Sequence, residues 1–285
     1  MGAQIIDGKS IGQGILQDVS RGVQDLLEKG IRPHLAVVIA GEDPASHVYV
    51  RNKERACVTC GISSTKIELP DSTNIEEILR VVDKLNRDSE VHGILVQSPV
   101  PEGIDEVAIA SSILPSKDVD GFHPQNLGRL VQGDLEGLLP CTPSGVMRIL
   151  EDCGAEMSGK RALVLGRSRI VGVPMALMLA QKGVDATVTV AHSRSDRVEN
   201  ICKESDIIVA AVGVPHIVKG SWVKPGAFVV DVGISRLDEG GLAGDVSPEV
   251  SEIAGWMTPV PGGVGPMTIA MLMSNTLKSA KGLNN

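Results

Sequence analysis

Short runs of apolar, β-branched residues alternate along the chain with segments in which apolar residues recur every three or four positions. In the first half the runs predict strands at residues 34–40, 65–69 and 91–97. The helical spacing there predicts helices at 11–28, 45–61, 75–86 and 107–114. Strands that are apolar throughout and alternate with helices are typical of a parallel sheet covered on both faces. We therefore predict an α/β fold for this half.

Residues 115–142 break the alternation, because they are rich in Pro, Gly and Asp, and they predict a linker or a crossing that carries a site. A helix is expected at 144–153. Strands are then expected at 161–166, 186–191, 206–213 and 224–233, with helices at 173–183, 196–205 and 268–281. The sequence therefore predicts two α/β domains with a cleft between them. The first spans 1–139, and the second is a Rossmann-type domain at 140–265. The last segment, 266–285, is expected to return to the first domain.

Composition narrows the classes of function. The chain has 285 residues, 27 Lys and Arg against 35 Asp and Glu, and a net charge of −8, so nucleic acids and acidic membranes are not expected as partners. Apolar runs are too short for a membrane span, and the N-terminus lacks a secretion pattern. Five cysteines, an odd number, indicate free thiols and a cytoplasmic location. The pair Cys57 and Cys60 has no second pair or His cluster beside it, so we predict no metal site; a redox role stays open.

A glycine loop follows the expected strand at 161–166. It starts at Gly166, continues through Arg167 and Ser168 to Gly172, and leads directly into a helix. A strand, a tight turn and a helix N-terminus can hold a pyrophosphate on backbone N–H groups. Ser168 stands where the usual dinucleotide motif has its second Gly, so an ordinary strand-to-helix turn remains an alternative.

The next strand favours one nicotinamide cofactor over the other. An NAD site usually carries Asp or Glu at the end of this strand, where the carboxylate holds a ribose hydroxyl. Here the strand ends in His192, Ser193, Arg194 and Ser195. A hydroxyl and a guanidinium suit a 2′-phosphate, and Arg167 is a second candidate, so we predict NADP. The alternative is that these residues only cap the following helix.

Four polar residues are expected at the carboxyl edge of the first sheet. Tyr49, the single tyrosine, and Lys53 lie four positions apart on the helix after the first buried strand. Gln97 ends another strand, and Asp120 follows the next helix. Such edges present ligand groups in α/β folds. A surface lysine beside a half-buried ring is the plainer interpretation. A short-chain dehydrogenase is disfavoured, because there the Tyr-x-x-x-Lys pair follows the glycine loop.

Taken together these motifs resemble one family along essentially the whole chain, the bifunctional methylenetetrahydrofolate dehydrogenase/methenyltetrahydrofolate cyclohydrolases. The matching stretches are Tyr49-x-x-x-Lys53, residues 96–99 (VQSP), 117–121 (KDVDG), 140–143 (PCTP), 166–172 (GRSRIVG) and 261–268 (PGGVGPMT). Ser98 departs from the Leu that the family usually has between Gln and Pro.

The resemblance implies an NADP-dependent oxidation of 5,10-methylenetetrahydrofolate to the methenyl cation, followed by hydrolysis to 10-formyltetrahydrofolate. It implies that Lys53 serves the hydrolysis step and that Gln97 orients this step by hydrogen bonding. It also implies that Tyr49 stacks on the substrate rings and that Asp120 accepts hydrogen bonds from the N–H groups of the pterin. Further implied contacts to the folate are Ser46, Pro261, Gly262 and Gly263. Implied contacts to NADP are Gly166, Arg167, Ser168, Ser193 and Ile234, to which we add Arg194. The family also implies a homodimer that binds tetrahydrofolate derivatives.

Three alternatives remain at this point. Another two-domain NADP dehydrogenase, such as a shikimate-type enzyme, would share the Lys-plus-Asp cleft and the Rossmann half, but the stretch at 261–268 discriminates against it. A non-catalytic nucleotide sensor would not need Lys53 or Asp120. A dehydrogenase with little cyclohydrolase activity would keep both.

Overall fold

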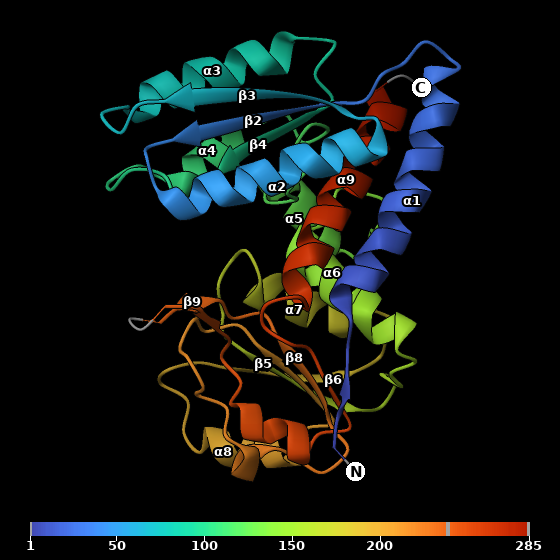
Figure 1. The fold of residues 1–285 in the computed structure, drawn as a ribbon, viewed down its shortest axis with the longest axis vertical. Coiled ribbons are helices and arrows are strands. Elements are labelled where there is room, and N and C mark those ends of the chain that lie inside the picture. The colour runs from blue at the N-terminus through green and yellow to red at the C-terminus, as the bar shows by residue number, and fades with distance from the viewer. Residues whose placement is uncertain (1, 238–239, 284–285) are drawn as a thin grey trace. The chain divides into compact units, whose positions relative to one another are not determined.

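A computed structural model describes residues 2–237 and 240–283. The chain folds into two compact units. One contains Gln13–Cys141 and the chain from Ile269 onward, and we call it the three-stranded unit. The other contains Thr142–Thr268 and the chain up to Gly12, and we call it the six-stranded unit. The chain passes between the units within α1 (Gly8–Leu27), α6 (Cys141–Asp152) and α9 (Val264–Leu283) (Figure 1).

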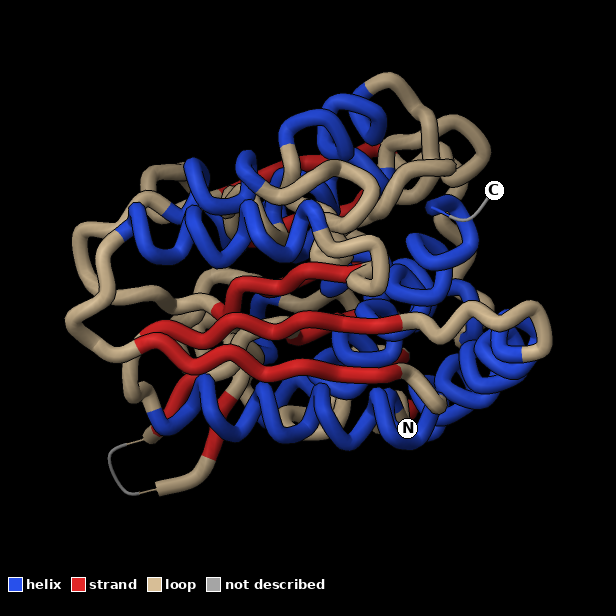
Figure 2. The backbone as a smooth tube through the Cα atoms, turned by 90° about the horizontal axis from the view of Figure 1, so that it is seen from above, coloured by secondary structure: helices blue, strands red, loops and turns tan. Residues whose placement is uncertain are grey.

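The three-stranded unit has a fully parallel sheet in the order β3-β2-β4. Its strands are β2 (His34–Ala40), β3 (Ser63–Leu69) and β4 (Gly93–Gln97). Its further helices are α2 (Pro44–Cys60), α3 (Ile75–Arg87), α4 (Glu106–Ser112) and α5 (Pro124–Val131). Helices run alongside the strands (Figure 2). Every residue of β2 after His34 is buried, which explains why this strand is apolar throughout.

The six-stranded unit has a parallel sheet in the order β1-β11-β8-β7-β5-β6. Its strands are β1 (Gln4–Ile5), β5 (Arg161–Leu165), β6 (Thr187–Ala191), β7 (Ile207–Ala210), β8 (Phe228–Asp231) and β11 (Trp256–Met257). The unit also contains α7 (Gly172–Leu179), α8 (Val198–Glu204), two short 3-10 helices (Gly220–Trp222 and Pro248–Glu252) and a small antiparallel pair, β9 (Ser235–Arg236) with β10 (Leu242–Ala243). The order β6-β5-β7 makes this a Rossmann-type sheet, as expected.

Each unit has its own aliphatic core, because the chain has only two Trp, two Phe and one Tyr. In the three-stranded unit the core includes Ala36, Val38, Ile78, Val82 and Ile94, all completely buried. In the six-stranded unit it includes Leu163, Ile208 and Val229 on adjacent strands. Two of the few aromatic rings, Phe228 and Trp256, stack on one another with centroids 5.4 Å apart.

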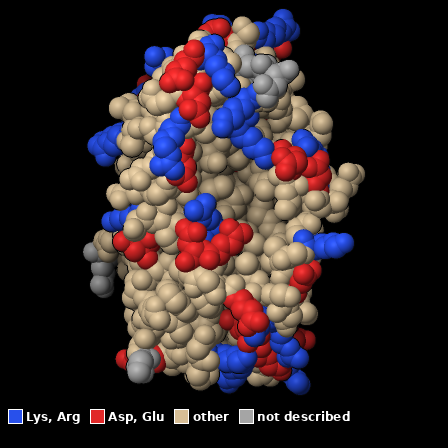
Figure 3. Space-filling view, turned by 90° about the vertical axis from the view of Figure 1, so that its right-hand side faces the viewer, with Lys and Arg blue, Asp and Glu red and all other residues tan. Residues whose placement is uncertain are grey.

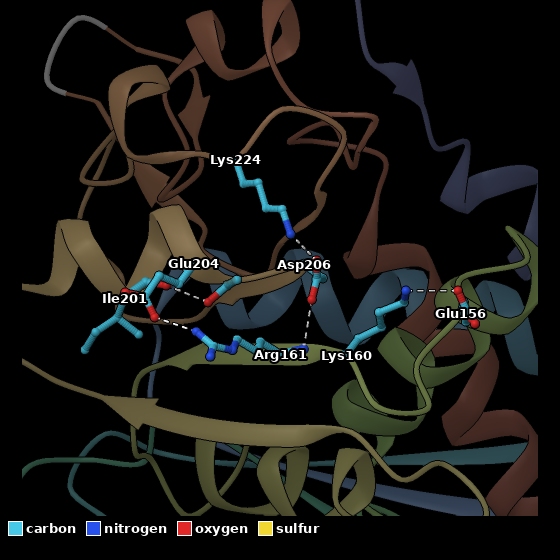
Figure 4. A network of polar contacts seen from close by, with 8 residues as sticks. Glu156, Lys160, Arg161, Ile201, Glu204, Asp206 and Lys224 are labelled. Atoms are coloured by element: carbon cyan, nitrogen blue, oxygen red, sulfur yellow. Dashed lines mark hydrogen bonds and ion pairs between the residues drawn. The ribbon is translucent and has the colours of Figure 1, made fainter.

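An ion-pair network lies where β5 and β7 begin in the six-stranded unit (Figure 4). Asp206 accepts from the backbone N–H of Arg161 at 3.0 Å and pairs with Lys224. Arg161 also pairs with Glu204. These groups lie at the amino ends of the strands, opposite to the edge at which a Rossmann-type sheet binds its ligand. We therefore assign them a structural role.

Two differences between the structure and the sequence-based expectations bear on the domain organisation. The expected linker at 115–142 contains α5, whose first position is Pro124 and whose N-cap is His123, the ring of which accepts from Gln125 N. The chain up to Gly12 was expected in the first domain, but it belongs to the six-stranded unit. The reason is that β1 adds a parallel strand beside β11.

On the face drawn in Figure 3, acidic and basic side chains are interspersed and do not form a field of one sign. Among the described residues, no helix combines the length and the apolar character needed to cross a bilayer.

Candidate functional site

The three-stranded sheet has a topological switch point at the carboxyl end of β2, because its neighbours β3 and β4 lie on opposite sides of it. Gly41 leaves β2 with a positive φ of 92°. Asp43 then caps α2, and its Oδ2 accepts from both the N–H and the hydroxyl of Ser46 at 2.8 Å. This cap fixes the start of the helix that carries Tyr49 and Lys53.

Lys53 and Gln97 are brought together as the sequence predicts. Lys53 is only 8% exposed, and its Nζ donates to Gln97 Oε1 at 2.9 Å. The amide of Gln97 also donates to the backbone carbonyl of Ser98 at 2.6 Å, which fixes its orientation. Tyr49 lies one helical turn before Lys53 and is 38% exposed, so its ring is available to a ligand. Ser46, in contrast, is buried, and its hydroxyl is engaged by Asp43.

Asp120 is held at the same edge by its neighbours. Asp118 forms a parallel bridge with Ile94 of β4, and its buried carboxylate accepts from the N–H groups of Phe122 and His123. Gly121 has a φ of 78°, and a Cβ there would lie 2.4 Å from the carbonyl carbon of Leu139. The residues on both sides of half-buried Asp120 are therefore fixed.

Burial perturbs the ionisable groups of this site in opposite directions. Desolvation lowers the pKa of Lys53 below its usual value, and the charge of Asp120 opposes this shift. Desolvation raises the pKa of Asp120, and Lys53 opposes that shift in turn. Burial also raises the pKa of Asp118 to about 7. A lysine with a lowered pKa is a candidate for proton transfer near neutral pH.

Two neighbours of this site were not predicted from the sequence as site residues. The buried thiol of Cys141 donates to the carbonyl of Val119 at 3.2 Å. The side chain of Asn275, from α9, donates to the carbonyls of Val119 and Leu139, both at 2.8 Å. They support the backbone beside Asp120. Cys141 lies in the stretch at 140–143 that resembles the family, whereas no sequence pattern marks Asn275.

The six-stranded sheet has its switch point at β5, which lies between β6 and β7. Gly166 follows β5 with a φ of 117°, and a Cβ there would lie 2.2 Å from the carbonyl oxygen of Ala211. Gly172, which begins α7, could not carry a Cβ either, since that atom would lie 2.3 Å from the oxygen of Gly166. Ser168 Oγ accepts from Gly172 N at 3.3 Å and from Val171 N at 3.2 Å. The missing second Gly is thus replaced by a serine that orders the turn.

A cavity of about 490 Å³ opens at this switch point. Its lining contains four of the predicted cofactor residues, Gly166, Arg167, Ser168 and Ser193. The other lining residues are Leu165, His192, Ser195, Val198, Ala211, Val212, Val214, Ile217 and Trp222. Arg194 and Ile234 are exposed and are not part of this lining. Glycines that permit close approach, a helix N-terminus and exposed Arg167 fit an anionic dinucleotide.

The remaining predicted residues, Pro261, Gly262 and Gly263, form the turn before α9 in the six-stranded unit. Gly262 has a φ of 108°, and a Cβ on Gly263 would lie 2.7 Å from the oxygen of Pro259. Pro261 is exposed. Only glycine fits this turn at both positions.

Comparison with known proteins assigns both units. Residues 6–120 match the family model of the tetrahydrofolate dehydrogenase/cyclohydrolase catalytic domain, and residues 140–284 match that of its NAD(P)-binding domain. The chain belongs to the tetrahydrofolate dehydrogenase/cyclohydrolase family. It is therefore a dehydrogenase/cyclohydrolase enzyme of one-carbon folate interconversion, and the predicted family and α/β fold are confirmed.

Individual relatives of this family cover almost the whole chain. The bifunctional protein FolD of Acetivibrio thermocellus is 51% identical over 99% of this chain and 98% of its own. The FolD crystal structure from Campylobacter jejuni has a TM-score of 0.95 at 46% identity, covering 98% of this chain and 99% of its own. The Trypanosoma brucei dehydrogenase-cyclohydrolase, complexed with NADP cofactor and inhibitor, has a TM-score of 0.93 at 41% identity, covering 99% and 98%.

Family membership decides against two of the three alternatives that the sequence left open. It disfavours a shikimate-type dehydrogenase and a non-catalytic nucleotide sensor, because both halves of the chain match the folate family. The matched NAD(P)-binding domain confirms a nicotinamide dinucleotide as cofactor, and the preference for NADP over NAD stays a prediction.

Proposed function

We propose that this enzyme oxidises 5,10-methylenetetrahydrofolate with NADP and hydrolyses the resulting methenyl cation to 10-formyltetrahydrofolate, with Lys53 as the proton-transfer group of the second step. The observation that carries the proposal is the pairing of buried Lys53 with Gln97 at a sheet edge. The residues around the cavity at β5 would hold NADP, which would supply a hydride acceptor for the one-carbon bridge. Because the product is a cation that forms directly, the first step needs positioning and no general base.

The second step needs a proton acceptor, since water adds to the cation and must lose a proton. The lowered pKa of Lys53 increases the fraction of neutral amine near neutral pH. A cationic substrate beside Lys53 lowers this pKa further, because like charges disfavour protonation. The amine then takes one proton from the attacking water and can return it to the ring nitrogen that leaves as the ring opens. The remaining hydroxyl proton is released to solvent as the carbonyl forms. Gln97 holds Nζ in place through its acceptor oxygen.

The other predicted residues bind substrate in this proposal. Half-exposed Tyr49 stacks on the folate rings, and Asp120 accepts hydrogen bonds from the amino-pyrimidine part of the pterin. Ser46 acts indirectly, since its hydroxyl is engaged in the helix cap. The turn of Pro261, Gly262 and Gly263 offers a backbone surface without bulky side chains to the folate.

The cofactor is held by the residues around the cavity at β5. Gly166 and Ser168 shape the turn that faces the pyrophosphate, while Arg167 and Ser193 take the 2′-phosphate. Arg194 and Ile234 lie outside the cavity lining, and we propose that they contact the bound cofactor from exposed positions. The side chain of His192 has one defined orientation, because its Nδ1 accepts from Arg194 N at 3.2 Å.

A two-stage absorbance assay tests the proposal. Purified enzyme with methylenetetrahydrofolate and NADP should reduce NADP, and enzyme with isolated methenyltetrahydrofolate should bleach that cation without cofactor. NADP reduction without acceleration of the second reaction would leave a dehydrogenase alone and remove the role of Lys53. Absence of both reactions would reject the whole assignment.

We also propose that the enzyme is a cytoplasmic homodimer. All five cysteines are free in the structure, which supports a reducing compartment. Strand β6 forms an outer edge of the six-stranded sheet within the described part of the chain, and its residues Thr187, Thr189 and Val190 are exposed. An exposed β-branched edge is a surface on which sheets pair. Light scattering should give twice the chain mass of 29.9 kDa; a mass of one chain would contradict the dimer.

A further inference from the structure

A completely buried carboxylate lies behind one wall of the cofactor cavity. Asp245 has no exposed surface, and its two oxygens accept three consecutive backbone N–H groups. Oδ2 accepts from Val212 at 2.6 Å and from Gly213 at 3.1 Å, and Oδ1 accepts from Val214 at 2.9 Å. Val212 and Val214 line the cavity, and their segment has no regular secondary structure after β7 ends. The three bonds therefore tie an irregular wall to the interior of the unit.

A second buried carboxylate fixes Asp245 itself. Asp231, at the end of β8, accepts from the backbone N–H groups of Asp245 and Val246, both at 2.9 Å, and from Gly233 at 3.0 Å. Its own N–H donates to Thr258 Oγ1 at 2.7 Å. The two carboxylates thus form a chain of contacts from Thr258 through Asp231 to Asp245.

Two glycines make room for the carboxylates, one beside each. A Cβ on Gly233 would lie 2.2 Å from Asp245 Oδ1, and a Cβ on Gly244 would lie 1.9 Å from Asp231 Oδ2. No side chain fits at either place without moving a carboxylate. Burial of two acids close together is costly unless each is fully hydrogen-bonded, so this arrangement needs a reason beyond packing.

We propose that Asp245 is a positioning residue for the cofactor, which holds the backbone of residues 212–214 in the conformation that the dinucleotide contacts. A wall that is ordered before binding saves the entropy of ordering it on binding, and so raises affinity. Asp245 itself lies behind the wall and does not line the cavity. The inference rests on the assignment of the cavity at β5 to the cofactor.

The test compares Asp245→Asn with a matched control, Asp206→Asn. Asp206 is another carboxylate of the same unit that accepts from a backbone N–H, but it lies at the amino ends of the strands, away from the cavity lining (Figure 4). NADP binding is measured by calorimetry and by the fluorescence of Trp222, which lines the cavity. Hydrogen exchange of the peptide covering 211–214 is measured without cofactor.

In Asp245→Asn an NH₂ group replaces one carboxylate oxygen, so a donor faces the backbone N–H groups of residues 212–214 that the oxygen accepted from. We expect the Kd for NADP to rise about tenfold or more, which corresponds to about 1.4 kcal/mol, and exchange at 211–214 to accelerate. Asp206→Asn should change neither quantity. Equal Kd and equal exchange in folded Asp245→Asn and wild type would overturn the proposal. Failure of the wild type to bind NADP at this cavity would instead overturn the cofactor assignment.

If Asp245→Asn does not fold, the variant Ser235→Ala tests whether the order of residues 212–214 governs NADP affinity. Ser235 is half-buried on β9, and its hydroxyl donates to the carbonyl of Gly213, a residue of the same wall, at 3.3 Å. Ser235→Ala should raise the Kd for NADP a few-fold and speed exchange at 211–214. If wall order does not govern affinity, exchange will rise with an unchanged Kd, and that result would contradict the proposal. Unchanged values of both quantities would contradict it as well.

Discussion

Replacing Lys53 with methionine tests the central step of the proposed chemistry. Methionine keeps most of the apolar stem and removes the amine that donates to Gln97. A positioned general base contributes roughly 10²- to 10⁴-fold to a rate. Lys53→Met should therefore lower kcat for hydrolysis of methenyltetrahydrofolate by that factor, which corresponds to about 3–5 kcal/mol of barrier.

Lys53→Arg separates proton transfer from charge. A guanidinium keeps the positive charge but cannot lose its proton in a protein. If neutral Lys53 is the base, the arginine variant should be as slow as the methionine variant. In the wild type, kcat for hydrolysis should rise as the pH passes upward through the lowered pKa of Lys53, and this limb should vanish in both variants.

Lys117→Met is the matched control. Lys117 is the same residue type, is also buried in the three-stranded unit, and donates to the carbonyls of Leu85, Asn86 and Asp88 at 3.1, 3.0 and 2.6 Å. Its loss leaves these acceptors unpaired, so we expect a destabilisation of about 3 kcal/mol and a fall in Tm of roughly 2–4 °C per kcal/mol. Hydrolysis by folded enzyme should be unchanged. Lys53 variants within twofold of wild type, or an equal loss in Lys117→Met, would refute the role of Lys53.

Three further predictions concern other parts of the chain. Ser98→Leu removes only the exposed hydrogen bond from the Ser98 hydroxyl to Glu106 Oε1 at 2.5 Å. The free energy of unfolding measured in urea should therefore change by less than about 0.5 kcal/mol, and the dehydrogenase and hydrolysis rates should be kept. A larger loss of stability or of either rate would show that Ser98 shapes the Gln97 site. Arg167→Gln should raise KM for NADP about tenfold and leave KM for NAD unchanged, as steady-state kinetics can check; a parallel rise for NAD would contradict the 2′-phosphate role. Burial raises the pKa of Asp231 from 3.8 to about 6, so the folded state binds more protons than the unfolded state between these pH values. The stability of wild type relative to Asp231→Asn should therefore fall by about 2 kcal/mol as pH rises from 4 to 7, and urea titrations showing an increase would reverse the assigned sign.

Much of the fold follows from the sequence, because the buried parallel strands are apolar throughout and the helices have a clear period. Strand β2 has the predicted bounds, 34–40, and α3 differs by one residue from the predicted 75–86. Helix α5 was missed because its eight residues lie among Pro and Gly signals that indicate a loop. Strand β1 was missed because two residues carry no period, and only its pairing with β11 defines it.

The residues of the candidate sites also fall into those that the sequence predicts and those that it does not. Residues at the ends of strongly predicted strands, such as Gln97 and Gly166, could be placed at a sheet edge from the sequence alone. The contact between Lys53 and Gln97 joins residues 44 positions apart and follows from the order of the strands. Asp245 could not be found this way, because its partners belong to a loop without a pattern. Its function depends on a three-dimensional arrangement of N–H groups that no local motif encodes.

The pairing of β1 has a practical consequence for making this protein in the laboratory. The backbone N–H groups of Ala3, Gln4 and Ile6 donate to the carbonyls of Ser251, Gly255 and Met257 at 2.6–2.9 Å. A deletion of these first residues, or a tag that displaces them, would leave β11 with an open side from which another chain could extend the sheet, and would favour aggregation during expression. Affinity tags and truncations should therefore leave the segment from Ala3 to Ile6 in place.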